Sequence, residues 1–420
     1  MLYERWRQVA RACPNQTALQ DLAGGGRWTF GEFAGAAENG APPKAPIAFP
    51  QGGSPEFILG VLRAWRFGQV ICPLEPGQAQ PRVARKLPPG IIHLKTTSAT
   101  TGAPRLIAFT AAQLMADAEN IVTTMGLRPD WPNLGVISLA HSYGFSNLIL
   151  PLLLHGIPLV LAGSALPEAV RRAAATKRGF TLPAVPALWR AWQEAGAISP
   201  KIRLAISAGA PLPLPLEQSI FAAHGLKIHN FYGSSECGGI AYDATPRPRA
   251  DGACAGAPLR RVKVSVAKDG CLEVRSAAVA QFYWPQPARD LGAGVFHTSD
   301  LAELRGGRVY LRGRAGDQIN IAGRKVSPET VEKVLAAHPR VRTCLAFGVP
   351  SSAVGRGETI VACIETSGRV SSKALREFLT TKLPAWHVPR EWWFVDSLQA
   401  NGRGKLSRTE WRRRYLSTAT

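Results

Sequence analysis

Cysteine is scarce and scattered in this sequence, and long apolar runs are missing. The cysteines lie at positions 13, 72, 237, 254, 271, 344 and 363, and no two of them form a C-x-x-C pair. This spacing argues against a disulfide framework and against a structural zinc site. The longest apolar run, 147–163, is interrupted by prolines, a glycine and His155, so we expect a buried helix and strand there. The first residues lack the apolar core of a secretory signal, and together these absences predict a cytoplasmic protein.

The composition is that of a folded protein with an excess of positive charge. The 420 residues are 46% hydrophobic and 19% charged, which excludes a mostly disordered chain. The formal net charge of +21 attracts polyanions such as nucleotides, coenzyme A, nucleic acid or anionic lipid. The arginines are mostly dispersed, however, and the only dense basic run is 412–414. Without a clustered basic and aromatic surface, nucleic-acid binding is the weaker interpretation.

Strand-like and helix-like segments alternate through the first half of the chain. Between about 91 and 240 this alternation predicts an α/β fold with largely parallel strands flanked by helices. Strands are expected at 135–140, 157–162, 179–183, 202–208 and 226–229. After about 252, short β-strands predict a small antiparallel β subdomain, and the last hundred residues or so read as a small α+β domain. We therefore expect an N-terminal domain over 1–313 and a C-terminal domain over 314–420.

Several polar segments could carry chemistry. The segment 96–105 holds five hydroxyl side chains, a glycine and Arg105, which suits phosphate oxygens but also describes a solvated loop. The segment 230–236 (NFYGSSE) could cover a purine with its tyrosine and hold Mg²⁺ with its hydroxyl and carboxylate, or could be a strand end and turn. Asp300, at an expected strand end, could accept hydrogen bonds from a ribose diol or cap a turn.

Two further segments suit movement between domains. Gly316 and Gly323 permit unusual backbone angles, which suits a hinge and a tight β-turn. The segment 327–329 (SPE) can open a helix with proline at its first position. Lys405 lies in a glycine-rich segment that is either solvated or delivered to a site by a moving domain.

In this order the segments resemble the motifs of the adenylate-forming superfamily, which contains acyl- and aryl-CoA synthetases, amino-acid adenylation domains and luciferases. Residues 97–106 (TSATTGAPRL) are similar to its phosphate loop, and 232–236 (YGSSE) to its Y-G-x-T-E motif. Residues 207–212 (SAGAPL) are similar to its adenine loop, and 296–300 (FHTSD) to its W-x-H-T-G-D motif. Residues 313–317 (GRAGD) are similar to its hinge, and 401–408 (NGRGKLSR) to its terminal lysine segment. The resemblance covers nearly the whole chain.

The resemblance implies a two-step reaction. A carboxylic acid attacks the α-phosphate of MgATP, and a thiol of CoA or of a carrier protein then takes the acyl group from the acyl-adenylate. Lys405 would bridge the acid and the α-phosphate, Glu236 with Ser235 would hold Mg²⁺, and Asp300 with Arg314 would bind the ribose. The other nucleotide-binding residues that the motifs imply are Thr97, Ser98, Thr100, Thr101, Gly102 and Arg105 for the phosphates, and Gly209, Ala210, Pro211, Asn230, Phe231, Tyr232, Gly233 and Ser234 for the adenine side.

The resemblance also indicates the class of acid and a domain movement. His141 lies in LAHSYG (139–144), where acyl- and aryl-CoA ligases commonly have P-x-x-H-x-x-G, and it is a third catalytic candidate. No aspartate that could hold a substrate amine lies between Trp131 and Ser164, so a free amino acid is not expected. The apolar residues after His141 fit a fatty or aromatic acid and equally fit plain core. After adenylation the C-terminal domain would rotate about Gly316 to admit the thiol.

Some features depart from the family pattern. Ala99 replaces a glycine of the phosphate loop, Arg105 a lysine and Ser299 a glycine, and the lobe between Pro76 and Thr97 is short. A CoA ligase is the leading hypothesis, and an acyl-AMP ligase that loads the phosphopantetheine of an acyl carrier protein is the nearest alternative. A degenerate, non-catalytic nucleotide-binding protein is favoured by the short lobe and opposed by the retained charged motif residues.

Overall fold

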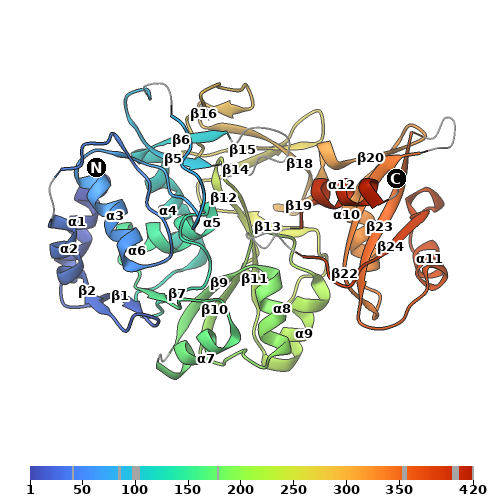
Figure 1. Cartoon of the computed structure of the whole chain (residues 1–420), viewed down its shortest axis with the longest axis horizontal. Coiled ribbons are helices and arrows are strands. Elements are labelled where there is room, and N and C mark those ends of the chain that lie inside the picture. Colours follow the sequence, from blue (N-terminus) through green and yellow to red (C-terminus); the bar gives the residue numbers. More distant parts are fainter. Residues whose placement is uncertain are drawn as a thin grey trace.

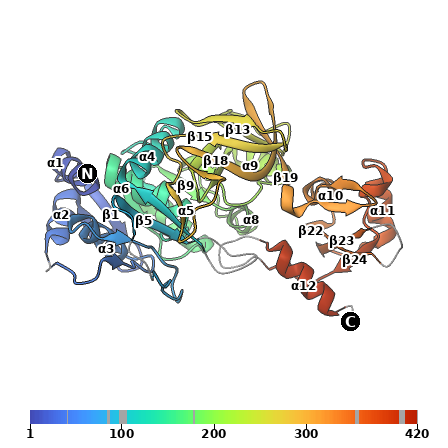
Figure 2. The same ribbon diagram turned by 90° about the horizontal axis from the view of Figure 1, so that it is seen from above.

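The computed structural model of the chain has a large N-terminal lobe and a small C-terminal lobe, with the two termini in opposite lobes (Figure 1, Figure 2). It describes residues 1–39, 42–83, 87–96, 105–176, 179–351, 357–399 and 406–418. Within these residues no helix is both long enough and apolar enough to cross a bilayer. The architecture confirms the expected fold class, a parallel-rich α/β region with a small β subdomain, followed by a small α+β region.

One large sheet runs through the N-terminal lobe. Its strands are β1 (Thr17–Asp21), β2 (Arg27–Thr29), β7 (Asn133–Gly135), β8 (Leu159–Leu161), β9 (Phe180–Ala184), β10 (Ile202–Ser207), β11 (Ile228–Ser234), β12 (Gly238–Tyr242), β13 (Cys254–Pro258), β14 (Lys263–Val266), β15 (Cys271–Arg275), β17 (Leu291–Gly292), β18 (Val295–Arg305) and β19 (Arg308–Arg314). Their order is β14-β15-β18-β19-β13-β12-β11-β10-β9-β7-β8-β1-β2, with β17 beside β18. The expected β subdomain is therefore one end of this sheet.

The sheet changes from parallel to antiparallel pairing within β11. Its first half pairs in parallel with β10, where Ser207 lies opposite Asn230. Its second half pairs antiparallel with β12, where Phe231 lies opposite Tyr242. Ligands of open α/β sheets bind beyond the carboxyl ends of strands where the connectivity reverses. The segment 230–236, expected as a strand end and turn, thus lies mostly inside a strand because β12 extends the pairing.

Helices bury apolar faces on the parallel part of the sheet. The N-terminal lobe contains α1 (Leu2–Ala12), α2 (Phe30–Glu38), α3 (Pro55–Arg66), α4 (Ala111–Met125), α5 (Ser142–Gly144), the π-helix η1 (Phe145–Ile149), α6 (Leu150–His155), α7 (Pro167–Thr176), α8 (Pro186–Glu194) and α9 (Leu214–His224). Helices α7 to α9 share one core with β7 to β10, and α1 to α4 with α6 belong to a second core. Trp189 and Trp192 are fully buried in the first core and donate their indole N–H groups to backbone carbonyls, so their polar atoms cost little on burial.

A smaller sheet packs beside the large one and brackets the phosphate-loop segment. Its strands are β3 (Ile47–Ala48), β4 (Val70–Ile71), β5 (Ile91–Thr96), β6 (Leu106–Thr110) and β16 (Phe282–Trp284), in the order β16-β6-β5-β4-β3. Strands β5 and β6 pair antiparallel, with Thr96 opposite Leu106. The end of β5 and the start of β6 therefore meet at the point where the segment 97–104 connects them.

The C-terminal lobe has its own core. Its elements are the 3₁₀ turn η2 (Ala315–Asp317), β20 (Ile319–Ile321), β21 (Arg324–Val326), α10 (Pro328–Leu335), β22 (Val341–Pro350), β23 (Glu358–Thr366), α11 (Ser372–Thr380), the 3₁₀ turn η3 (Ala385–His387), β24 (Glu391–Phe394) and α12 (Arg408–Thr418). The strands form a hairpin, β20-β21, and a three-stranded sheet, β22-β23-β24. This mixture of helices and strands confirms the small α+β region expected for the last hundred residues or so.

One expected strand is wrong. The segment 135–140 was expected as a strand, but β7 ends at Gly135 and the chain then turns toward α5. A Cβ atom on Gly144 would lie 1.9 Å from the carbonyl oxygen of Ser138. This close approach of two backbone segments requires glycine and folds 136–144 into a compact turn, which extended pairing would prevent.

A buried ionic cluster joins α9 to β11, β12 and the loop before β13. Arg249 and Glu217 are 4% and 0% exposed, and Arg249 Nε donates to Glu217 Oε2 at 2.8 Å. Lys227 donates to Glu217 and, at 2.6 Å, to Asp243 Oδ2. The guanidinium of Arg249 also donates to the carbonyls of Cys254 and Leu212, both at 2.8 Å. Each charge therefore has a partner, which is the condition under which buried charges are tolerated.

Replacement of Arg249 by methionine should strongly destabilise the N-terminal lobe. The substitution keeps an apolar stem but removes one of the two cations that pair with the buried Glu217 carboxylate. It also removes the donor to the Leu212 carbonyl and leaves the Cys254 carbonyl with only the longer hydrogen bond from Asn230. Breaking a buried pair in this way costs about 3–5 kcal/mol. Urea unfolding followed by tryptophan fluorescence measures this loss. Arg128→Met is the control, because its ion pair with Asp130 is about half exposed and should contribute under about 1 kcal/mol. Equal losses in the two variants would show that the cluster does not stabilise the fold.

Candidate active site

Side chains from β11, β18 and β19 form one half of the site. The Tyr232 hydroxyl donates to Asp300 Oδ2 at 2.5 Å, and Arg314 Nε donates to Asp300 Oδ1 at 3.1 Å. Asp300 lies within β18, not at its end, and is directly opposite Arg314 on β19. Burial raises the pKa of the Tyr232 phenol well above its ordinary value, and the Asp300 carboxylate adds to this shift, so the phenol stays protonated and donates. The structure thus joins three residues that lie far apart in the sequence.

The turn between β11 and β12 forms the other half of the site. Glu236 Oε1 accepts a hydrogen bond from the Tyr283 hydroxyl at 3.1 Å. The guanidinium of Arg105 lies 4.7 Å from the centre of the Tyr283 ring. This cation–π contact connects Tyr283, and through it Glu236, to the residue just before β6. The Ser235 hydroxyl is 3.0 Å from that of Ser142 at the start of α5. Three distant segments therefore meet around Glu236.

Glu236 and Ser235 offer the oxygen ligands that Mg²⁺ prefers. Among the described residues there is no group of three or more histidine, cysteine or acidic side chains that could hold a metal ion alone. Proteins commonly bind Mg²⁺ through one or two carboxylates together with substrate phosphates. The residues present fit this second mode, in which Glu236 supplies the protein carboxylate and the nucleotide supplies most of the other ligands.

His141 is held at the edge of the Glu236 turn. It caps α5, and its Nδ1 accepts a hydrogen bond from the backbone N–H of Tyr143 at 3.4 Å. The preceding turn is tied down by Ser138, whose hydroxyl donates to the Glu75 carboxylate at 2.8 Å. These contacts hold the imidazole of His141 in place beside Ser142.

The loop expected to contact adenine, 208–212, follows β10. Gly209 has a φ of +84°, a left-handed conformation that favours glycine, and Ala210 and Pro211 continue the loop. Arg249 of the buried cluster holds the end of this loop through the Leu212 carbonyl. The side-chain N–H of Asn230 donates to the Cys254 carbonyl at 3.3 Å, so this group holds the backbone of Cys254 in place.

The middle of β11 is closely packed. Phe231 is buried, and its ring centre lies 6.0 Å from that of Tyr143. A Cβ atom on Gly233 would lie 2.5 Å from the Gly238 carbonyl oxygen, so glycine is required where β11 and β12 cross. The Ser234 hydroxyl accepts from the backbone N–H of Glu236 at 3.2 Å and shapes the turn that carries the carboxylate.

Part of the site inferred from sequence lies outside the described residues. These positions are Thr97, Ser98, Thr100, Thr101 and Gly102 of the phosphate loop, and Lys405. Their roles stay predictions.

Sequence reasoning missed several groups that the structure brings to the site. Lys95 is 5% exposed, and no hydrogen-bond acceptor for its ammonium is found among the described residues. Burial lowers the pKa of Lys95, while the carboxylates of Asp117 and Glu236 oppose this shift. A lysine inside the otherwise apolar strand 91–96 was a visible signal. Tyr283 gave no signal, because it lies almost fifty residues from Glu236 in the sequence.

Arg408 is a second missed residue, in the segment that follows Lys405. Its Nη1 donates to Asp317 Oδ2 at 2.6 Å, its Nη2 to Glu332 Oε1 at 2.9 Å and its Nε to the Ala346 carbonyl at 2.8 Å. Burial opposes the charged guanidinium, but the carboxylates of Glu332 and its neighbours outweigh it and raise the pKa of Arg408. Arg408 thus fixes the start of α12 to the turn that links the two lobes.

Comparison with known proteins identifies the family. A model of the AMP-binding enzyme family matches residues 91–284, and a model of the AMP-binding enzyme C-terminal domain matches residues 330–405. A probable 2-succinylbenzoate–CoA ligase of Mycobacterium tuberculosis is 30% identical over 355 residues, which cover 80% of this chain and 88% of that protein. A feruloyl-CoA synthase of Amycolatopsis is 29% identical over 344 residues, covering 77% and 69%.

Solved structures agree with this result at the level of the fold. The o-succinylbenzoate CoA synthetase of Bacillus subtilis, solved with its acyl-adenylate intermediate, superposes with a TM-score of 0.83 at 19% identity and covers 97% of each chain. The chain therefore belongs to the AMP-binding enzyme family. Within that family it is an acid–thiol ligase of the acyl-CoA synthetase type.

Replacement of Asp300 by asparagine should weaken nucleotide binding. Asparagine keeps the size of the side chain but removes the charge that pairs with Arg314 and that could accept two ribose hydroxyls. Hydrogen bonds to charged groups are worth about 1.5–3 kcal/mol, so the Kd for MgATP should rise about 10- to 100-fold. Isothermal titration calorimetry measures this constant. Asp269→Asn, on an exposed carboxylate beside His297, is the matched control and should not change it. An unchanged Kd in Asp300→Asn would remove Asp300 from the nucleotide site.

Proposed function

We propose that this protein activates a carboxylic acid with ATP, releases pyrophosphate and transfers the acyl group from the acyl-adenylate to the thiol of CoA. The observation that carries the proposal is the hydrogen-bonded group of Tyr232, Asp300 and Arg314 beside the Glu236 turn. It supplies a hydroxyl, a carboxylate and a cation at the point where the sheet changes its pairing. Such a site suits a ribose and a purine, and its position in a chain of this family supports the assignment.

Attack of a carboxylate on the α-phosphate brings two anions together. The protein must therefore supply positive charge and precise placement more than acid–base chemistry. We assign Glu236 and Ser235 to Mg²⁺, which would neutralise phosphate charge when bound. Arg105 and the hydroxyls of 97–101 would hold the β- and γ-phosphates. Lys405 would bridge the carboxylate and the α-phosphate, and His141 would line the entry of the acid.

The relatives indicate the class of acid and the class of acceptor, but not the particular acid. 2-Succinylbenzoate and the feruloyl group are both aromatic, and 2-succinylbenzoate carries two carboxylates. We therefore favour an aromatic or other short acid over a long-chain fatty acid. CoA is the acceptor named for both relatives, and no observation on this chain favours a carrier protein. The cysteines, all free and mostly buried, fit a reducing compartment, and we place the protein in the cytoplasm.

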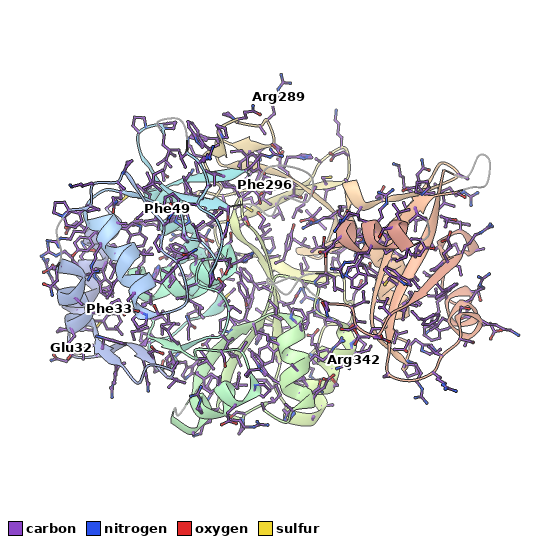
Figure 3. The ribbon with its side chains drawn as sticks, viewed as in Figure 1. Glu32, Phe33, Phe49, Arg289, Phe296 and Arg342 are labelled. Carbon is purple, nitrogen blue, oxygen red and sulfur yellow. The ribbon has the colours of Figure 1, made fainter. Side chains whose placement is uncertain are left out.

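We divide the chain into a catalytic domain over 1–313 and a lid domain over 314–420 that rotates near Gly316. Arg342 lies at the junction of the two lobes (Figure 3), where it donates to Glu194 Oε2 at 3.1 Å. A second pair, Lys333 with Asp251 at 2.7 Å, also joins the lobes. Partly exposed ion pairs of this kind contribute little free energy, so they can break and re-form during a rotation.

The pivot itself has an ordinary backbone. Gly316 lies in the 3₁₀ turn η2 and, unlike Gly323 with its φ of +83°, is not among the glycines with positive φ. No atom lies within 4 Å of a Cβ placed on Gly316. Space around the turn, not an unusual resting angle, is therefore what would permit rotation there.

Replacement of Lys405 by alanine should abolish the first step and spare the second. Loss of the bridging cation should lower acid-dependent ATP–pyrophosphate exchange by about 100- to 1,000-fold, the usual effect of removing one group that stabilises transition-state charge. Transfer from a chemically prepared acyl-adenylate to CoA should stay within a few-fold of wild type, because the lid has then turned Lys405 away. The control, Lys373→Ala, changes an exposed lysine of α11 in the same domain. Undiminished exchange in Lys405→Ala would overturn the assignment.

A pooled panel of aromatic, short and fatty acids identifies the acid class in the same assay. If folded wild-type protein binds MgATP and shows no acid-dependent exchange with any pool, the proposed activity is wrong.

A further inference from the structure

Lys95 is placed where a buried strand would ordinarily carry an apolar residue. It is the next-to-last residue of β5, lies opposite Ile107 on β6 and is 5% exposed. Since alternate residues of a strand share a face, Lys95 lies on the same face as His93, whose ring is 4.6 Å from that of Phe145. The ammonium therefore lies among aromatic side chains just before the phosphate-loop segment.

The ammonium of Lys95 lies near the carboxylates of Asp117 and Glu236 but makes no direct hydrogen bond to either of them. Its Nζ lies 4.5 Å from the centre of the Phe109 ring, and among the described residues it meets no hydrogen-bond acceptor. The oxygens of Asp117 are engaged elsewhere, because Oδ2 accepts from the Ser146 hydroxyl at 2.6 Å and Oδ1 from the Gly239 N–H at 3.1 Å. A lysine ammonium has three donors, and leaving them unpaired in a dry site is costly.

A small recess lined in part by Lys95 borders the candidate active site, although the Lys95 Nζ atom itself is buried. It is narrow, with a free volume of about 10 Å³, which is room for about one water molecule, and it opens to solvent. Its lining residues are Pro73, Glu75, Gln78, Lys95, Thr96, Ala140, His141 and Ser142. Ser142 lies 3.0 Å from the Ser235 hydroxyl, so the recess borders the Glu236 turn. A molecule that reaches from Glu236 toward β5 would bring its far end to Lys95.

We propose that Lys95 binds a second carboxylate on the acid, so that the substrates of this enzyme are short dicarboxylic acids activated at one end. A carboxylate would supply the acceptors that the ammonium lacks, and an unpaired buried cation strongly favours an anion over a neutral group. This inference rests on the proposed function, since it names the class of acid which that site activates.

The reacting carboxylate is a poorer partner for Lys95 than a second one. A carboxylate loses negative charge as it attacks phosphorus, so a fixed cation beside it would stabilise the ground state more than the transition state. The charge of a second carboxylate does not change during the reaction, and a permanent partner then improves binding at no kinetic cost. A mobile residue such as Lys405 suits the reacting end, and a residue fixed in a strand suits the far end.

The test compares dicarboxylic acids with their own monomethyl esters. 2-Succinylbenzoate, succinate and glutarate are assayed for acid-dependent AMP formation against the esters, which keep the shape and remove one charge. Wild type should prefer the diacid in kcat/KM, and Lys95→Met should lower this preference about 10- to 100-fold, the value of one hydrogen-bonded charge. Lys263→Met, the same change at an exposed position of β14, should leave it unchanged. The Kd for MgATP should be the same in all three proteins.

Three results would overturn the proposal. An equal loss for diacids and esters would place Lys95 at the reacting carboxylate, and a loss of MgATP affinity would place it at the phosphates. An unchanged preference with a lower unfolding midpoint would make Lys95 structural. We expect instead that Lys95→Met raises the midpoint of the unliganded protein, because it removes an unpaired buried charge.

A binding measurement separates this proposal from the proposed activity. The same diacids and esters are titrated calorimetrically into wild type and Lys95→Met without ATP. If no acid supports AMP formation but wild type binds a diacid and Lys95→Met does not, the activity is wrong and the anion site stands. If wild type binds no diacid in preference to its ester, the anion site is wrong whatever the activity assay shows.

Discussion

The arrangement of the candidate site depends on one buried guanidinium. Arg249 donates to Glu217 on α9, to the Leu212 carbonyl at the end of the loop after β10 and to the Cys254 carbonyl at the start of β13. Asn230 on β11 donates to that same Cys254 carbonyl. The guanidinium therefore holds the loop and β13 directly, and β11 through the shared carbonyl. A buried cation with fixed donors can hold separate backbone segments in one geometry, provided that its charge is matched. Glu217 supplies that match.

Charged groups differ between the two lobes in the way they are held. The N-terminal lobe presents the carboxylates of Glu236 and Asp300, which accept hydrogen bonds from Tyr283 and Tyr232. In the other lobe, Arg408 anchors the start of α12 to the turn that links the lobes. The partly exposed ion pairs between the lobes would offer little resistance to the movement proposed above. Lys95 differs, because it is a cation built into the N-terminal lobe itself.

The sequence predicted most of the fold because its patterns are local. Apolar runs such as 180–184 and 202–207 form buried parallel strands, and proline at the first position of α3 and α10 marks the start of each helix. The strand expected at 135–140 failed for a reason that is not local. A contact between Gly144 and the backbone of Ser138 folds that segment into a turn. The end of β11 was misjudged in the same way, since its extension depends on pairing with β12.

By itself the sequence determined the fold class, the family and the identity of the motif residues Tyr232, Glu236 and Asp300, because order and spacing along the chain carry that information. Only the tertiary structure decided which groups meet. It joined Tyr232 to Asp300 and Arg314, placed Tyr283 on Glu236, and left the ammonium of Lys95 buried beside Phe109. The physical reason is that hydrogen bonding and charge compensation depend on distance in space, and a strand pairing between residues far apart in sequence sets that distance.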